Sequence, residues 1–176
     1  MYSVTPKRQN KLTALSCIAC FVCGIGLFVA SIGQKGLPYV TIAAQMVSVL
    51  ILTAGIYLYS KFMARQFTYT VRPGGIFDAN GEEIYDFEVI ETVGGRRQRV
   101  VCRLALRDIV QVDARPARAS AKNGYPKIEP TKEGGEVFSY CADMVPGKVL
   151  AVYDADGNVV VLTYDRTLCD ILKQKQ

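Results

Sequence analysis

The sequence predicts a membrane helical hairpin followed by a mainly-β domain of the α+β class. Three observations predict it. The first third holds two long apolar runs without charge, most of the remainder alternates apolar and polar residues, and the last residues have helical spacing. The spans are predicted over residues 12–32 and 38–62, joined by a short external loop at 33–37. Each exceeds the about 18–20 residues that a helix needs to cross a hydrocarbon core of about 30 Å.

Charge sets the predicted topology. No acidic residue precedes Asp78, and basic residues flank the two spans, whereas the connecting loop has only Lys35. The positive-inside rule therefore places an N-terminal tail, residues 1–11, and the domain, residues 63–176, in the cytoplasm at the cell membrane. A cleaved signal peptide is the alternative for the first run, but this run exceeds the usual 7–15 apolar residues and a second span follows at once.

The same distribution argues against a nucleic-acid partner. The net charge is +5. Up to Arg65 the chain has six basic residues and no acidic residue, whereas the rest of the chain has fifteen basic and sixteen acidic residues. The domain itself is therefore nearly neutral, and it lacks the excess of basic residues that nucleic-acid binding requires.

Small and polar residues fall on one face of each predicted span. Close approach of small residues is what holds helices together in lipid. We expect the two faces to pack together, and Gln45 to form a hydrogen bond across the helix pair or to an oligomer partner. The predicted packing residues are Ser16, Cys20, Gly24, Ala44, Gln45, Ser48 and Gly55.

Cys17, Cys20 and Cys23 lie at three-residue spacing inside the first span. Metal clusters use closely spaced cysteines, but no fourth ligand is nearby and the chain has no histidine. We therefore favour small packing residues, with palmitoylation of Cys17 and a metal site as alternatives. We expect no metal and no cofactor.

The remainder reads as about seven short strands and one helix. Gly94-Gly95 is predicted as a two-residue loop that pairs Phe87 with Cys102 and Asp86 with Arg103. Pro73-Gly74-Gly75 is predicted as a turn, 115–135 as a long surface loop, and Asp165 as the cap of the last helix. The expected strands cover 65–72, 76–77, 85–93, 96–106, 106–113, 137–144, 148–154 and 159–164.

Three local patterns resemble the bacterial pleckstrin-homology-like membrane proteins that carry an N-terminal two-helix hairpin. They are Tyr69-Thr-Val71 leading to Gly75-Ile-Phe77, the segment from Leu106 to Asp113, and Asp156-Gly157 before a valine-rich strand and the closing helix. The resemblance implies a bent antiparallel seven-stranded sheet or barrel, closed at one end by the C-terminal helix. It also implies a binding or scaffolding module without shared catalytic residues.

The basic turn is the candidate binding site. Its arginines, Arg96, Arg97 and Arg99, together with Arg103, can hold phosphate of anionic lipid headgroups beside the membrane. Asp86, Glu88 and Glu91 lie on the partner strand and can neutralise them. A charge-paired hairpin, a lipid contact and a protein partner all remain open.

Other chemistry has weaker support. Asp154-x-Asp156-Gly157 resembles the start of a calcium loop but lacks its later ligands, so a hairpin turn is expected. The soluble cysteines have no histidine to activate them. We expect a membrane protein that presents a non-catalytic binding module. The alternatives are an accessory subunit of a larger membrane complex for transport, secretion or the envelope, whose spans pack with another membrane protein, and an enzyme of unrecognised class. The spans also allow a homo-oligomer.

Overall fold

The structure, a computed structural model, describes residues 1–7, 11–33, 38–77, 81–117, 127–141, 143 and 146–174. These residues form two compact units. One unit is helical and comprises Lys11–Ala64, and the other comprises Met1–Asn10 together with Arg65–Gln176.

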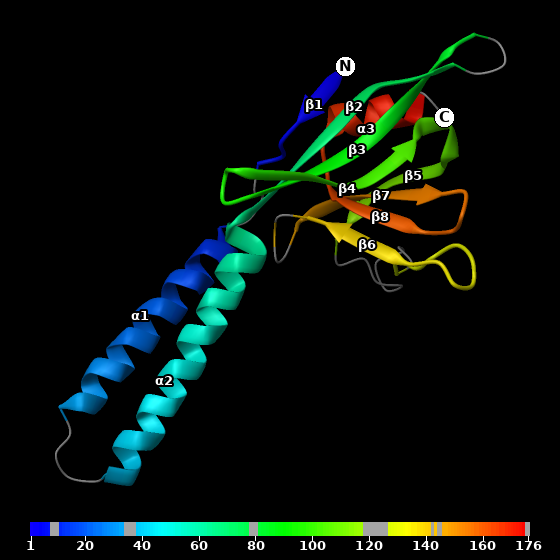
Figure 1. Cartoon of the computed structure of the whole chain (residues 1–176). Coiled ribbons are helices and arrows are strands. Elements are labelled where there is room, and N and C mark those ends of the chain that lie inside the picture. The colour runs from blue at the N-terminus through cyan, green and yellow to red at the C-terminus, as the bar shows by residue number, and fades with distance from the viewer. Residues whose placement is uncertain are drawn as a thin grey trace. The chain divides into compact units, whose positions relative to one another are not determined.

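The helical unit contains the two predicted helices (Figure 1). Both are long and apolar enough to cross a membrane. Helix α2 continues without a break into a short π-helical turn, η1. The bounds are α1 (Leu12–Ile32), α2 (Pro38–Leu58) and η1 (Tyr59–Met63).

Two glycines let the helices approach closely. A Cβ atom built on Gly24 would lie 2.7 Å from Cγ of Leu52, and one on Gly55 would lie 3.1 Å from Cβ of Cys20. The buried hydroxyl of Ser48 donates to the backbone oxygen of Gln45 at 2.7 Å, so this polar group is satisfied inside its own helix. The two helices are therefore closely packed at these glycines, as helices are where small residues face each other.

The first sheet is antiparallel, in the order β1-β2-β3-β4. Its first strand was not predicted: residues 1–11 were expected to form a tail, yet Ser3 lies opposite Thr70 in a regular pairing of β1 with β2. A run of three residues is too short to show alternation, so the sequence pattern alone could not detect it. The strands are β1 (Tyr2–Val4), β2 (Arg65–Phe77), β3 (Glu83–Val93) and β4 (Arg97–Ala105).

The predicted turn at Pro73-Gly74-Gly75 is wrong. Strand β2 runs through it, with an irregularity in its pairing to β3 between Pro73 and Ile76. Gly75 takes φ +70° there. A Cβ on Gly74 would lie 2.9 Å from the backbone oxygen of Ile84. The glycines thus form a kink in one long strand, which sequence reading confuses with a turn.

The predicted register of β3 and β4 is also wrong. Val93 pairs with Arg97, so the connection has three residues, and the register shifts again between Val89 and Ile90. Phe87 therefore lies opposite Leu104, and Asp86 lies opposite Ala105. Two successive left-handed glycines, Gly94 and Gly95, make this longer turn possible.

The second sheet has the order β5-β7-β8-β6, with β6 parallel to β8 and the other pairs antiparallel. Residues 106–108, expected in a strand, form a short 3-10 turn (η2), and β6 is shorter than predicted. Much of the expected loop at 115–135 lies outside the described residues. The elements are η2 (Leu106–Asp108), β5 (Ile109–Pro116), β6 (Val137–Tyr140), β7 (Lys148–Asp154) and β8 (Val159–Thr163).

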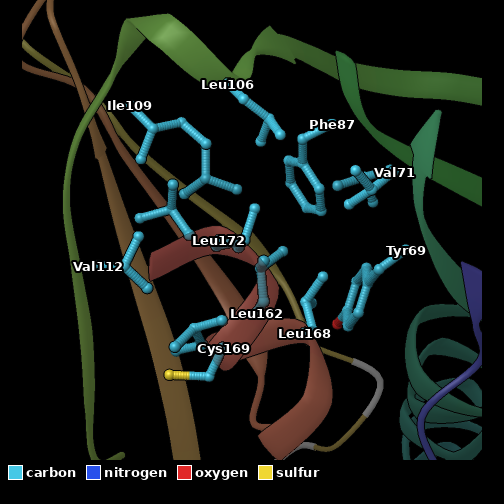
Figure 2. Close-up of a cluster of buried hydrophobic side chains, with 14 of the residues drawn as sticks. Tyr69, Val71, Phe87, Leu106, Ile109, Val112, Leu162, Leu168, Cys169 and Leu172 are labelled. Carbon is cyan, nitrogen blue, oxygen red and sulfur yellow. The ribbon is translucent and has the colours of Figure 1, made fainter. Parts of the chain in front are cut away.

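The core lies between the two sheets and the C-terminal helix α3 (Arg166–Gln174). Figure 2 shows Leu168 and Leu172 of α3 pointing toward Phe87 and the other buried side chains. As predicted, Asp165 caps α3: its Oδ1 accepts a hydrogen bond from the backbone N–H of Leu168 at 2.9 Å. The observed domain is therefore mainly β, with two sheets and one closing helix.

Tyr69 joins the two sheets inside this core. Its hydroxyl donates to the backbone oxygen of Tyr140 at 2.8 Å and accepts from the N–H of Thr163 at 3.0 Å. Desolvation by burial raises the pKa of Tyr69 far above its usual value, so the hydroxyl stays protonated and keeps donating.

Candidate functional site: an arginine-rich hairpin turn

The turn between β3 and β4 presents the predicted basic cluster. Gly94 and Gly95 adopt positive φ angles, and the N–H of Arg96 donates to the backbone oxygen of Val93 at 3.3 Å. This tight turn fixes the position of Arg96, in the turn, and of Arg97, at the start of β4.

A buried carboxylate anchors one side of the turn. Glu91 is 1% exposed and accepts from Nε of Arg99 at 2.6 Å, and Nη1 of Arg65 lies 3.2 Å from its other oxygen. Glu91 on β3 lies directly opposite Phe67 on β2 and Arg99 on β4. The three side chains therefore lie on the same face of the sheet, the inner one. Two guanidiniums thus share one carboxylate, and the group keeps one excess positive charge.

A second buried carboxylate binds arginines on the opposite face. Oε1 of Glu88, which is also 1% exposed, accepts from Nη2 of Arg72 at 2.7 Å and from the guanidinium of Arg103. Asp86 contacts Arg103 more weakly, at 3.8 Å. The expectation that acids of the partner strand can neutralise the arginines is therefore confirmed for Arg103, and in part for Arg99, which shares Glu91 with Arg65.

Arg96 and Arg97 differ from these paired arginines. Both are exposed, and neither side chain has an ion pair or hydrogen bond to the residues that the structure describes. With Val93, Gln98 and Arg99 they line an open hollow of about 700 Å³. Unpaired guanidinium groups at an open surface can donate bidentate hydrogen bonds to a phosphate oxygen pair.

The register places this turn at a defined end of the sheet. Val93 lies opposite both Arg65 and Arg97, so two strand spacings, about 10 Å, separate Arg65 from Arg97. Arg65 follows directly after the helical unit, which ends at Ala64. The unpaired arginines therefore lie close to the residue at which the chain enters the β domain.

Other residues singled out by the sequence lie apart from this turn. The carboxylate of Asp154 accepts from the backbone nitrogen and the side-chain nitrogen of Asn158, and it thereby stabilises a hairpin turn. No group of three or more metal-binding side chains occurs among the described residues. Burial raises the pKa of Cys102 and of Cys141 to about 11, so both thiols are protonated at neutral pH.

In the helical unit, the residues expected at the packing face differ in how far they are buried. Gly24, Ser48 and Gly55 are buried, and Ser16, Cys20, Ala44 and Gln45 are partly buried. Of the cysteine triplet, Cys17 is buried and Cys23 is exposed, and all three are free thiols.

Sequence reasoning missed Arg65 and Arg72 as members of the two ion-pair groups. Both belong to β2, and only the pairing of β2 with β3 brings them beside Glu91 and Glu88. The period-2 spacing of Arg65, Phe67 and Tyr69 was a usable signal, because it places Arg65 on the apolar face of its strand.

No protein-family model, curated protein or solved structure matches the chain.

Proposed function

We propose that the chain is an integral membrane protein that crosses the cell membrane twice and presents its β domain at the cytoplasmic surface as a non-catalytic binding module. The pairing of β1 with β2 carries this proposal. These strands flank the two apolar helices in the chain, yet they are neighbours in one sheet. The segments before and after the spans must then lie on the same side of the bilayer.

Charge supports the choice of side. The N-terminal segment contains Lys7 and Arg8, Lys11 begins the helical unit, and Lys61 and Arg65 follow the second span. By the positive-inside rule this side is the cytoplasm.

The pleckstrin-homology-like fold is part of the proposal. Two four-stranded sheets and a closing helix that inserts Leu168 and Leu172 into the core support it. The parallel strand β6 is a departure from the all-antiparallel sheet that the resemblance implies.

We assign the module's ligand to the phosphate groups of anionic lipids, bound by Arg96 and Arg97. Two features support this assignment: these side chains lack partners within the described residues, and they lie about 10 Å from the residue that follows the second span. Juxtamembrane basic residues each contribute about 1 kcal/mol at an anionic leaflet. The group that Arg65 and Arg99 form with Glu91 adds one excess positive charge near this pair, whereas Arg103 is held by Glu88 on the opposite face.

The absence of catalysis is also proposed. The protonated thiols of Cys102 and Cys141 support it, because a nucleophilic cysteine needs a lowered pKa. An activity dependent on a carboxylate or tyrosine of the β domain would overturn this part.

Membrane insertion is tested on the full chain in bacterial membranes. Alkaline carbonate should leave the protein in the pellet, and protease added to sealed inside-out vesicles should degrade the β domain. Release by carbonate would contradict insertion. Protection in inside-out vesicles would place the domain on the other side.

Lipid contact is tested in nanodiscs by hydrogen exchange at residues 93–99. Anionic lipid should slow exchange at this turn relative to neutral lipid. Replacing Arg96 and Arg97 together with Ser should remove the difference. Arg107→Ser is the matched control, because Arg107 is exposed and lies outside the turn, 3.6 Å from Asp108. Equal exchange in both lipids would reject lipid contact and favour a protein partner at the turn.

A further inference from the structure

Helix α2 has a second stripe of residues, and the first helix leaves its β-branched members exposed. Its members alternate in spacing between four and three residues, which is the a/d pattern of a two-helix seam. They are Ile42, Gln45, Val49, Leu52, Ile56 and Tyr59.

The three β-branched members of this stripe are open. Ile42 is 55% exposed, Val49 is 53% exposed and Ile56 is 59% exposed. Of the alternate positions, Gln45 and Leu52 are partly buried, Leu52 by packing on Gly24 of α1, and Tyr59 is exposed. β-branched residues at a and leucine at d are the combination that favours parallel helix pairs.

Gln45 is the polar member of the stripe. It is the eighth residue of α2, so it lies about 10 Å along the helix from Pro38. Its side-chain amide makes no hydrogen bond to the residues that the structure describes. The hydroxyls of Ser31 and Ser48 donate to the backbone oxygens of Phe28 and Gln45, and among the described residues neither hydroxyl is bonded to the Gln45 side chain.

An amide in hydrocarbon without a partner is costly, since nothing in the lipid replaces its hydrogen bonds to water. A second copy of this chain is the partner that fits best. A primary amide is both donor and acceptor, so two Gln45 side chains can satisfy each other across a two-fold axis. Copies inserted in the same direction also place Gln45 at equal depth, and they run α2 parallel to its counterpart.

We propose that the chain forms a parallel homodimer in the membrane, with α2 packed on α2 along this stripe and the two Gln45 amides hydrogen-bonded to each other. This inference rests on the proposed membrane insertion. It gives Gln45 a function, because a single polar residue in such a seam fixes the register of the two helices and the number of chains that associate.

The test uses the full chain, labelled at its C-terminus with a donor or an acceptor fluorophore and reconstituted into liposomes over a range of densities. Energy transfer between donor-labelled and acceptor-labelled chains should show that they form a dimer. Gln45→Leu should weaken dimerisation on the order of tenfold, as expected for amide hydrogen bonds between helices in lipid. Gln45→Asn should retain most of the affinity, because the amide is kept.

Met46→Leu is the matched control. Met46 is 67% exposed and lies next in sequence, but outside the stripe, so this variant should dimerise like the unaltered chain. Monomers at every density, or equal dimerisation of Gln45→Leu, would overturn the proposal. Carbonate extraction of the same samples separates the two ideas: a monomer that stays in the membrane refutes only the dimer, whereas an extracted chain refutes insertion itself. A different protein that binds natively and is lost in Gln45→Leu would also overturn the second copy as partner.

Discussion

The helical hairpin and the β domain bury opposite kinds of side chain. In the hairpin the buried positions are small, such as Gly24, Ser48 and Gly55, whereas Ile18 and Val22 face outward. In the domain the fully buried positions include large ones, such as Phe87. Burial of large apolar groups lowers the free energy of a protein in water but not in lipid. Helices in lipid are stabilised by close packing instead. This contrast is what the proposed membrane insertion predicts, with the hairpin in lipid and the domain in water.

The largest expected effect comes from truncating a large core residue of the domain. Phe87 is 0% exposed, so Phe87→Ala should lower the free energy of unfolding of the domain by about 3–5 kcal/mol. Urea titration in detergent micelles, followed by tyrosine fluorescence, measures it. The same kind of change in the hairpin, Val22→Ala, removes a side chain that is 66% exposed and should cost almost nothing. Comparable losses for both variants would remove the contrast.

The reverse change, from small to large, should destabilise the hairpin. Gly24→Leu forces a side chain against Leu52 and should cost roughly 1–3 kcal/mol. Gly26 lies on the same helix with nothing within 4 Å of its Cβ position, so Gly26→Leu should be tolerated. Unfolding of the helices by SDS titration, followed by circular dichroism, compares them. Equal effects at the two glycines would show that close helix approach contributes little.

A smaller effect is expected from the thiols of the β domain at high pH. Burial raises the pKa of Cys102 and Cys141 from 9.0 to about 11. Between these values the unfolded chain loses protons that the folded chain keeps, so stability present below pH 9 falls as the pH rises to about 11. For Cys141 the loss should be on the order of 1 kcal/mol.

The measurement is urea unfolding at several pH values between 8 and 11. Tyrosine and lysine also titrate in this range, so the comparison is with the double variant Cys102→Ala/Cys141→Ala. Its stability should fall less steeply with pH. Parallel curves would mean that these thiols are accessible to water in the folded domain.

The parts of the fold that follow from local pattern were predictable. Helix bounds at Leu12 and Ile32, strand β7 over Lys148–Asp154 and the cap at Asp165 all follow from hydrophobic runs, alternation or capping chemistry. Two of the errors arose where glycines permit two geometries. At Gly74 and Gly75 the chain kinks and continues, and at Gly94 and Gly95 it turns with one more residue than expected.

The candidate site was predictable only in part. Arg96 and Arg97 stand out from sequence because two glycines precede them. The division between paired and unpaired arginines was not predictable, because it depends on the register that brings Arg99 to Glu91 and Arg103 to Glu88. A shift of one residue in a strand moves every side chain to the other face.

The pairing of β1 with β2 also dictates an order of assembly during synthesis. Val4 leaves the ribosome before its partner Tyr69 does, and all of α1 and α2 is made in between. At 5–20 residues per second, this delay is roughly 3–13 seconds. Strand β1 therefore has no partner until both helices have been synthesised, and the first sheet of the domain is completed only after the hairpin has left the ribosome.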